Sequence, residues 1–324
     1  MNKQYQQLTQ QPRYQIYAYR KAGMSLRQIA NELNVHFSTI SRELSRNAVN
    51  SEYDPEVAHE LSIARKQTSI KANRRSTSTD KIIRKCLQLN GSPLAISLRI
   101  EVELEADDML SHTTIYRRIE DDRRQGGALY RQLPRYGKTR WKGGKRHRNA
   151  GAKLIPDRVD ISERPEIVES RERLGDWEGD TVHGQNANLV TLVDRKSRFT
   201  LVQRVFSKTK EEVANAMIEL LGQVHTVLTV TLDNGGEFAD HVRVSNETGA
   251  SMYFAKPYAS WQRGTNENTN GRIRRFWPKK FDMATLMEQE IEDRILLLNL
   301  TPRKVLGGLT PFEAFTGKRV ALIT

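Results

Sequence analysis

The sequence lacks the features that mark secreted, membrane and nucleotide-hydrolysing proteins. Cys86 is the single cysteine among 324 residues, which excludes a disulfide within the chain and a zinc site built from cysteines. No stretch approaches the roughly 18 apolar residues of a spanning helix, and the N-terminus, rich in Gln and Tyr, lacks the apolar core of a signal peptide. A Gly-rich phosphate loop ending in Lys-Ser or Lys-Thr is missing, which disfavours a nucleoside triphosphatase. We therefore expect a protein of the reducing cytoplasm.

Positive charge is present in excess. Lys and Arg number 52 against 39 Asp and Glu, which gives a formal charge of +13 and a pI near 9.8. This excess favours a polyanionic partner, and nucleic acid fits better than a membrane surface because no membrane-spanning run exists. The length predicts two or more domains, since a single core rarely organises more than about 250–300 residues.

Residues 1–50 have the pattern of a helix-turn-helix domain. A first helix over 14–23 is followed by Ser25 and Gln28 at capping-box spacing, and then by an apolar stripe at helical spacing. In the next helix, over 37–46, Ile40 and Leu44 face inward. Short polar residues and arginines stay outside, where they can reach base edges and phosphates: Ser38, Thr39, Ser41, Arg42 and Arg46. The alternative is a generic three-helix fragment with a solvated polar face.

The next hundred residues divide into two basic linkers and a second predicted helix-turn-helix. Residues 51–77 indicate a basic helical linker with a helix over 55–63, and residues 131–155 form a basic linker without acids between 131 and 148. Residues 78–130 are similar in pattern to the first domain, and we expect Thr113, Thr114 and Arg117 to contact DNA. In the second linker the candidates are Arg140, Lys142 and Arg146, with a flexible solvated linker as the alternative.

Residues 156–324 predict an α/β domain. Strands are expected over 177–182, 189–193, 198–205, 227–232 and 252–255, with the second and third forming a hairpin. Helices are expected over 209–224, 266–276 and 288–300. This order predicts an α/β sandwich around a mixed sheet, so the whole chain is expected to be multidomain, all-α in its N-terminal part and α/β in its C-terminal part.

Three acids of this domain are candidates for a metal site. Asp180 lies inside the first strand, Asp233 ends a strand expected to be its parallel neighbour, and Glu267 lies at the start of a helix. Carboxylates gathered at one sheet edge repel one another unless cations intervene, and their hard oxygens suit Mg²⁺ or Mn²⁺. Two such ions about 4 Å apart support in-line displacement at phosphorus. Taken alone, each acid could instead be an ordinary turn or helix residue. The period-two alternation of a strand places Asp176, Glu178 and Asp180 on the same face, so it does not select one of them.

Segments 175–182 (GDWEGDTV), 231–238 (TLDNGGEF) and 260–271 (SWQRGTNENTNG) resemble the catalytic core of IS30-family transposases. Further matches are 155–159, 163–165, 302–304 and 310–313, and segments 38–44 and 111–116 resemble the two helix-turn-helix elements of the family. The resemblance covers nearly the whole chain and selects Asp180 as the first acid. The family has 33 residues between its second Asp and its Glu, and here 267 − 233 = 34 leaves 33. Arg272, Trp277 and Lys280 depart from the family pattern.

The resemblance implies a DDE transposase of a bacterial cytoplasm, with an RNase H-like core. It implies that Asp180, Asp233 and Glu267 hold two Mg²⁺ ions, with Mn²⁺ as substitute, and that double-stranded DNA with terminal inverted repeats is bound by a dimer or higher multimer. The expected phosphate contacts, with a solvated helix face as the alternative, are Lys256, Arg263, Arg272, Arg274 and Arg275. Two other hypotheses are a DNA-binding regulator that kept the fold without the chemistry, and a structure-selective RNase H-type nuclease.

Overall fold

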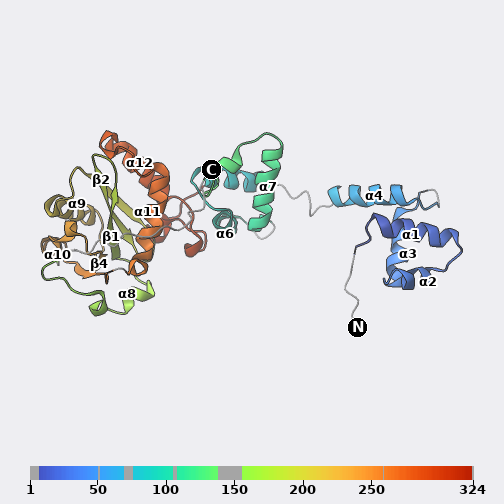
Figure 1. The fold of residues 1–324 in the computed structure, drawn as a ribbon, viewed down its shortest axis with the longest axis horizontal. Helices are drawn as coiled ribbons and strands as arrows, with labels where there is room; N and C mark the ends of the chain where they lie inside the picture. The colour runs from blue at the N-terminus through green and yellow to red at the C-terminus, as the bar shows by residue number, and fades with distance from the viewer. Residues whose placement is uncertain are drawn as a thin grey trace. The chain divides into compact units, whose positions relative to one another are not determined.

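A computed structural model describes residues 7–49, 52–68, 76–104, 108–137, 155–257 and 259–322. They form two compact units, one within residues 1–75 and the other within residues 76–324 (Figure 1). None of the helices in these ranges is long and apolar enough to cross a membrane.

The described residues of the first unit form four helices, α1 (Gln10–Lys21), α2 (Leu26–Glu32), α3 (Phe37–Asn47) and α4 (Pro55–Thr68). The predicted capping box is confirmed, because the Ser25 side chain accepts from the backbone N–H of Gln28 and the Gln28 side chain accepts from that of Ser25. Ile16, Ile29 and Ile40 form the centre of the core. The first and last helices are longer than predicted, since polar residues of high helix propensity extend them beyond the apolar stripe.

The second unit begins with three helices, α5 (Thr77–Gln88), α6 (Pro93–Glu103) and α7 (His112–Arg124). Ser92 and Ser111 cap α6 and α7, with Pro93 at the first helical position as predicted. The apolar faces of these helices share a core with Leu322, near the C-terminus. The second predicted helix-turn-helix thus packs against the end of the chain, and its boundaries stay predictions.

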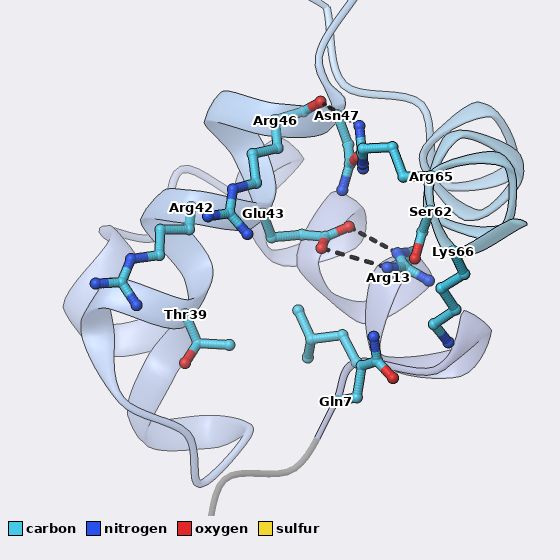
Figure 2. A pocket seen from close by; sticks show the side chains of 11 residues that line it. Gln7, Arg13, Thr39, Arg42, Glu43, Arg46, Asn47, Ser62, Arg65 and Lys66 are labelled. Carbon is cyan, nitrogen blue, oxygen red and sulfur yellow. Dashed lines mark hydrogen bonds and ion pairs between the residues drawn. The ribbon is translucent and has the colours of Figure 1, made fainter. Parts of the chain in front are cut away.

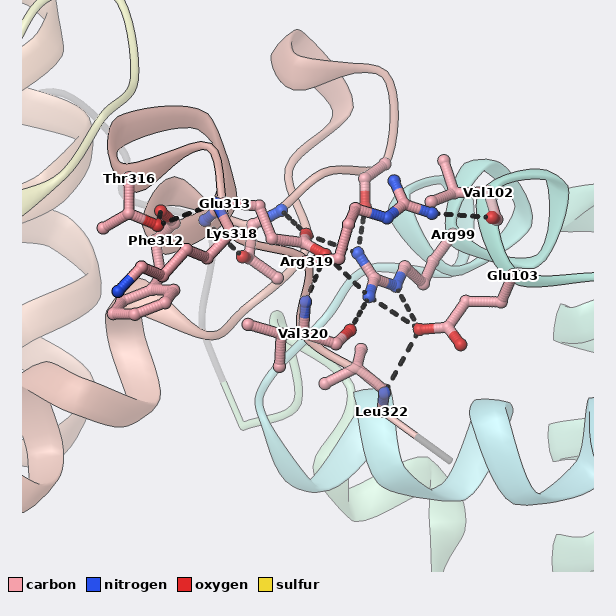
Figure 3. A network of polar contacts seen from close by, with 12 residues as sticks. Arg99, Val102, Glu103, Phe312, Glu313, Thr316, Lys318, Arg319, Val320 and Leu322 are labelled. Atoms are coloured by element: carbon pink, nitrogen blue, oxygen red, sulfur yellow. Dashed lines mark hydrogen bonds and ion pairs between the residues drawn. The ribbon is translucent and has the colours of Figure 1, made fainter. Parts of the chain in front are cut away.

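A buried ion pair joins α6 to the C-terminal segment (Figure 3). The guanidinium of Arg99 donates to Glu313 at 2.5 and 3.1 Å and to Glu103 at 2.8 Å. Burial alone would raise the pKa of Glu313, but hydrogen bonds from Arg99 and from two backbone amides lower it to about 2. Arg319 extends the network by donating to the carbonyl of Val102 at 3.0 Å.

The rest of the second unit is built on a five-stranded sheet of order β3-β2-β1-β4-β5. The strands are β1 (Asp176–His183), β2 (Asn188–Asp194), β3 (Thr200–Val205), β4 (Thr229–Leu232) and β5 (Ser251–Phe254). β1, β2 and β3 pair antiparallel, and β1, β4 and β5 pair parallel. The predicted hairpin and mixed sheet are confirmed, and each strand lies within two residues of its predicted bounds at either end.

Helices cover both faces of the sheet (Figure 1). On one face, α9 (Lys210–Gly222) and α10 (His241–Thr248) pack on a core that contains Trp177, Val190 and Leu232. On the other, α11 (Gly264–Phe276) and α12 (Glu288–Asn299) pack on Val182 and Leu189. The even-numbered residues of β1, which include Asp180, share a face with Val182 and therefore point toward α11.

Several short elements that the sequence pattern did not predict complete the fold. They are η2 (Leu129–Gln132), η3 (Ile161–Glu163), α8 (Ile167–Ser170), η4 (Gly236–Phe238), η5 (Ser260–Arg263), η6 (Met283–Thr285), η7 (Lys304–Leu306) and α13 (Pro311–Thr316). The helix α10 was missed as well, because its polar, β-branched sequence HVRVSNET has low helix propensity. Its clearest signal is Gly249, which ends it at φ +72°.

Candidate active site and nucleic-acid interface

The parallel register of β1 and β4 brings Asp180 and Asp233 to adjacent positions. The paired residues Asp176↔Thr229, Trp177↔Val230 and Glu178↔Thr231 are all 53 apart in sequence. Continued by two residues, this offset puts Asp233 beside Asp180, since 180 + 53 = 233. Asp180 therefore lies within β1, beside the carboxyl end of β4, and Asp233 directly follows that end, an edge where α/β proteins place ligands.

The other two acids of β1 are buried and satisfied within the fold. Both side chains have no measurable exposure. Asp176 accepts from Arg173 at 2.8 Å and from the Thr229 hydroxyl at 2.7 Å. Glu178 accepts from the Arg195 guanidinium at 2.7 Å and from a backbone N–H of α11 at 3.0 Å. These contacts give both acids a structural role.

Asp180 has a different environment, formed by α11 and by the residues that precede it. Asn270 donates through Nδ2 to Oδ2 of Asp180 at 2.8 Å, and the Asn270 carbonyl oxygen accepts from the Thr191 hydroxyl at 3.4 Å. Burial raises the pKa of Asp180; the charge of Arg263 opposes this rise and the charge of Asp233 adds to it. Asp180 is thus a partly buried carboxylate with a second carboxylate beside it, which makes cation binding favourable.

Arg263 lies between the two aspartates. Its Nη2 donates to Oδ2 of Asp233 at 3.0 Å, its Nη1 donates to the carbonyl of Gly179 at 2.9 Å, and Nη1 lies 3.6 Å from Oδ1 of Asp180. We expected Arg263 to contact a DNA phosphate, but in this structure its guanidinium engages the carboxylates. Both carboxylates therefore already accept a cation.

Glu267 lies in the first turn of α11 and is exposed. It precedes Asn270 by three residues, so the two side chains share a helix face, and Asn270 contacts Asp180. Among the residues that the structure describes, no three His, Cys, Asp or Glu side chains lie close enough together to hold a metal ion. The structure thus brings Asp180 and Asp233 together and leaves Glu267 on the adjacent helix face.

Three residues near these acids were missed as site residues. Besides Asn270, they are Gly235 and Glu237, which follow Asp233. The backbone N–H of Gly235 donates to Oδ1 of Asp233 at 2.9 Å, and a Cβ at Gly235 would lie 2.4 Å from a Glu237 oxygen and 2.9 Å from Oδ1 of Asp233. Glu237 accepts from Lys208 at 2.5 Å. The segment quoted above as 231–238 already contained the signal, because two glycines beside an acid indicate close backbone approach.

The five DNA contacts predicted in the first unit all lie on α3. Arg42 and Arg46 are exposed, and Ser38, Thr39 and Ser41 are partly exposed. Figure 2 shows Thr39, Arg42 and Arg46 around a pocket of about 420 Å³, close to the buried Arg13–Glu43 ion pair. Ser38 also hydrogen-bonds the His36 ring at 2.8 Å. The polar face of α3 is therefore open, while its inner face is fixed by the core.

The remaining predicted contacts fall into three groups. On α7, Thr113 and Thr114 share hydrogen bonds with the capping Ser111 hydroxyl, and Arg117 is exposed. Lys256 is exposed, whereas burial lowers the pKa of the partly buried Arg272, Arg274 and Arg275. Those three arginines thus do not form a fully solvated face. The last group lies outside the described residues: Arg140, Lys142 and Arg146.

Comparison with known proteins gives consistent matches to both parts of the chain. A family model described as a helix-turn-helix domain matches residues 4–47, and one described as an integrase core domain matches residues 171–260. The transposase for insertion sequence element IS4351 of Bacteroides fragilis is 40% identical over 313 residues, 95% of each chain. Transposase InsI for insertion sequence element IS30A of Escherichia coli (strain K12) is 35% identical over 320 residues, which cover 94% of this chain and 82% of the relative. The catalytic core domain of BIV integrase is 22% identical and covers 44% of this chain and 94% of its own, with a TM-score of 0.36.

Proposed function

The chain belongs to the family of insertion-sequence transposases that includes those of IS4351 and IS30A, and from this premise we propose that Asp180, Asp233 and Glu267 are its catalytic triad. As a transposase it binds DNA and catalyses strand cleavage and strand transfer. The proposal adds that the cleaved strand lies at the terminal inverted repeats of its element. The freed 3′-hydroxyl then attacks a phosphodiester of the target strand, and the 3′-oxygen of that strand leaves.

One observation carries this assignment. Asp180 lies on β1, Asp233 directly follows the parallel strand β4, and both engage one guanidinium, that of Arg263. Two neighbouring carboxylates repel each other when both are ionised, and a cation between them removes this repulsion. A pair of carboxylates around one cation is therefore the arrangement expected at a metal-binding edge. Asp176 and Glu178 are buried in ion pairs of their own, which leaves Asp180 as the acid of β1 available for chemistry.

The donor set fits Mg²⁺, with Mn²⁺ as substitute. Carboxylate oxygens are the ligands that both ions prefer, and the Arg263 guanidinium stands where the two aspartates accept positive charge. Asp180, Asp233 and Glu267 would hold two ions. When bound, such ions lower the pKa of an attacking water or hydroxyl and stabilise the leaving oxygen at phosphorus.

The protein's own residues orient these ligands. Asn270 fixes one oxygen of Asp180 by its hydrogen bond and leaves the other toward Arg263. The backbone N–H of Gly235 fixes one oxygen of Asp233 in the same way. We propose that Arg263 keeps the two aspartates together before ions bind, and that Glu267 joins them from the exposed face of α11.

The helix-turn-helix of the first unit would bind the inverted repeats through the polar face of α3, with arginines on phosphates and short polar residues on base edges. Residues 78–130 would form the second such domain. We also propose that the chain acts as a homodimer or higher multimer on DNA, since the two ends of an element must be processed together.

Strand transfer from a labelled inverted-repeat end of the element tests the triad. We expect Mg²⁺-dependent products from the intact protein and none from Asp180→Asn, Asp233→Asn or Glu267→Gln, with DNA binding retained in all three. Equal strand transfer by any of these variants would remove that residue from the triad. DNA binding without a Mg²⁺-dependent product from the intact protein would favour the regulator hypothesis.

A further inference from the structure

A cationic pocket of about 340 Å³ borders α11 on the side opposite Glu267. Thr265, Asn268, Thr269 and Arg272 line it, and their spacing of three, one and three residues places them on one helix face. Glu267 and Asn270 lie on the other side of the same helix. The pocket is therefore separated from the acidic edge of the sheet by the width of one helix, about 10 Å.

Five cationic side chains contribute to this pocket from four parts of the second unit: Arg171, Arg198, Arg272, Arg303 and Lys304. Arg171 follows α8, Arg198 follows the β2–β3 turn, and Arg303 and Lys304 follow α12. Among the described residues that line the pocket, none is an Asp or a Glu. Like charges gathered without carboxylates repel one another, so the arrangement is unfavourable until an anion enters.

Arg303 is the clearest indication that the pocket is an anion site. It is only 5% exposed, and its Nε is buried without a hydrogen-bond partner. Its Nη2 donates to the carbonyl of Leu298 at 3.0 Å, which holds the side chain in place. Burial, with the charges of Arg272, Arg275 and Arg198, pushes the pKa of Arg303 well below its ordinary value. Since a guanidinium stays protonated in proteins, an anion is the partner that satisfies it.

The other lining groups suit a phosphate. Arg198 donates to the Thr265 hydroxyl at 2.6 Å, which orients its guanidinium beside the first turn of α11. Gly264 and Thr265 line the pocket, so the positive end of this 13-residue helix borders it. Arginine forks match the oxygens of a phosphate, which several of them can contact together.

We propose that this pocket, defined by Arg171, Arg198, Arg272, Arg303 and Lys304, binds a backbone phosphate of the DNA strand that passes the acidic edge. The exposed Arg171, Lys304 and Val305 leave its mouth open to a polymer. At about 3.4 Å of axis per nucleotide and about 10 Å of helix width, the bound phosphate would lie about three nucleotides from the reacting one. The proposal rests on the proposed function, because it takes α11 to lie along bound DNA.

The salt dependence of DNA binding tests the pocket directly. For the full chain and a random-sequence duplex, the slope of log K against log salt should be smaller by about 0.9 in Arg272→Gln, the value for one lost phosphate contact. Lys304→Gln should act in the same direction. The matched control is Lys196→Gln, which removes an exposed charge close to Arg198 without lining the pocket, and it should keep the original slope.

A second arm, the unfolding temperature in millimolar inorganic phosphate, identifies the source of the anion. Stabilisation of the parent chain by phosphate, lost in Arg272→Gln, together with the reduced slope supports a DNA-phosphate pocket. Phosphate stabilisation with an unchanged slope would make it a site for the free anion and overturn the proposal. Unchanged slopes in both pocket variants, without stabilisation, would also overturn it. Strand transfer by Asp180→Asn reports on the triad alone, so the two proposals fail separately.

Discussion

The sharpest test of the site compares two neighbouring acids of β1 that sequence periodicity cannot tell apart. Glu178→Gln should unfold at a lower temperature and remain active below it, whereas Asp180→Asn should keep its stability and lose activity. Glu178 has no measurable exposure and pairs with Arg195, whose side chain is 1% exposed. Asp180 is partly exposed and disfavoured as an anion by burial.

The magnitudes follow from these environments. Removing one partner of a buried ion pair costs about 3–5 kcal/mol. Arg195 keeps Glu169 as a second partner at 3.0 Å, so the low end applies. At about 2–4 °C per kcal/mol for a unit of this size, Glu178→Gln should lower the unfolding temperature by about 6–12 °C. Asp180→Asn would remove a proposed metal ligand, which should reduce transition-state stabilisation by several kcal/mol. A loss of about 3 kcal/mol already corresponds to a rate more than a hundredfold lower.

Calorimetry gives the unfolding temperature of each variant. Strand transfer is then measured on the same preparations at 20 °C below the lower of the two unfolding temperatures. Glu178→Gln should retain most activity there, because its carboxylate contacts Arg195 and a backbone amide and not the other acids of the site. A Glu178→Gln variant that unfolds like the parent chain yet is inactive would refute the structural role of Glu178. An Asp180→Asn variant that transfers strands at the parental rate would refute the catalytic role proposed for Asp180.

Three further predictions concern other parts of the chain. Gly235→Ala should reduce strand transfer at least tenfold with a change in stability of about 1 kcal/mol or less. The added Cβ would lie 2.4 Å from a Glu237 oxygen and 2.9 Å from Oδ1 of Asp233, so it would displace these carboxylates and not the core. Unaltered kinetics would contradict this. Glu313 has a pKa of about 2 against an ordinary 4.5, so it stabilises the fold above pH 4.5 and loses that contribution as the pH falls toward 2. Glu313→Gln should therefore lower the free energy of unfolding by about 3 kcal/mol at pH 7. It should also flatten the acid limb, the fall of the free energy of unfolding at low pH. An acid limb identical to that of the parent would exclude the Arg99 pair as its origin. Ser25→Ala should destabilise the first unit by about 1 kcal/mol, seen in its denaturant midpoint, and Ser25→Asp should restore it.

Local patterns in the sequence were enough to predict the helices and strands that carry the fold. The Ser25 capping box, Pro93 at a helix start and the β-branched run before Asp233 each act over a few residues, so their physics can be read along the chain. The mixed sheet followed because an alternating order of strands and helices has few packed solutions. The short α10 escaped because its propensity is low and its packing supplies the stability.

Which acids of β1 are held in buried ion pairs could be decided only by the tertiary structure. Asp176, Glu178 and Asp180 lie on the same face of β1, so the strand pattern cannot separate them. Their environments differ because of partners that other elements contribute, such as Arg195. The contact of Arg263 with Asp233 also depends on the fold, and the sequence predicted only that Arg263 contacts a DNA phosphate. Side-chain charge is a property of the sequence, but which charge neutralises which depends on contacts between residues far apart in the chain, and those contacts form only when the sheet and its helices pack.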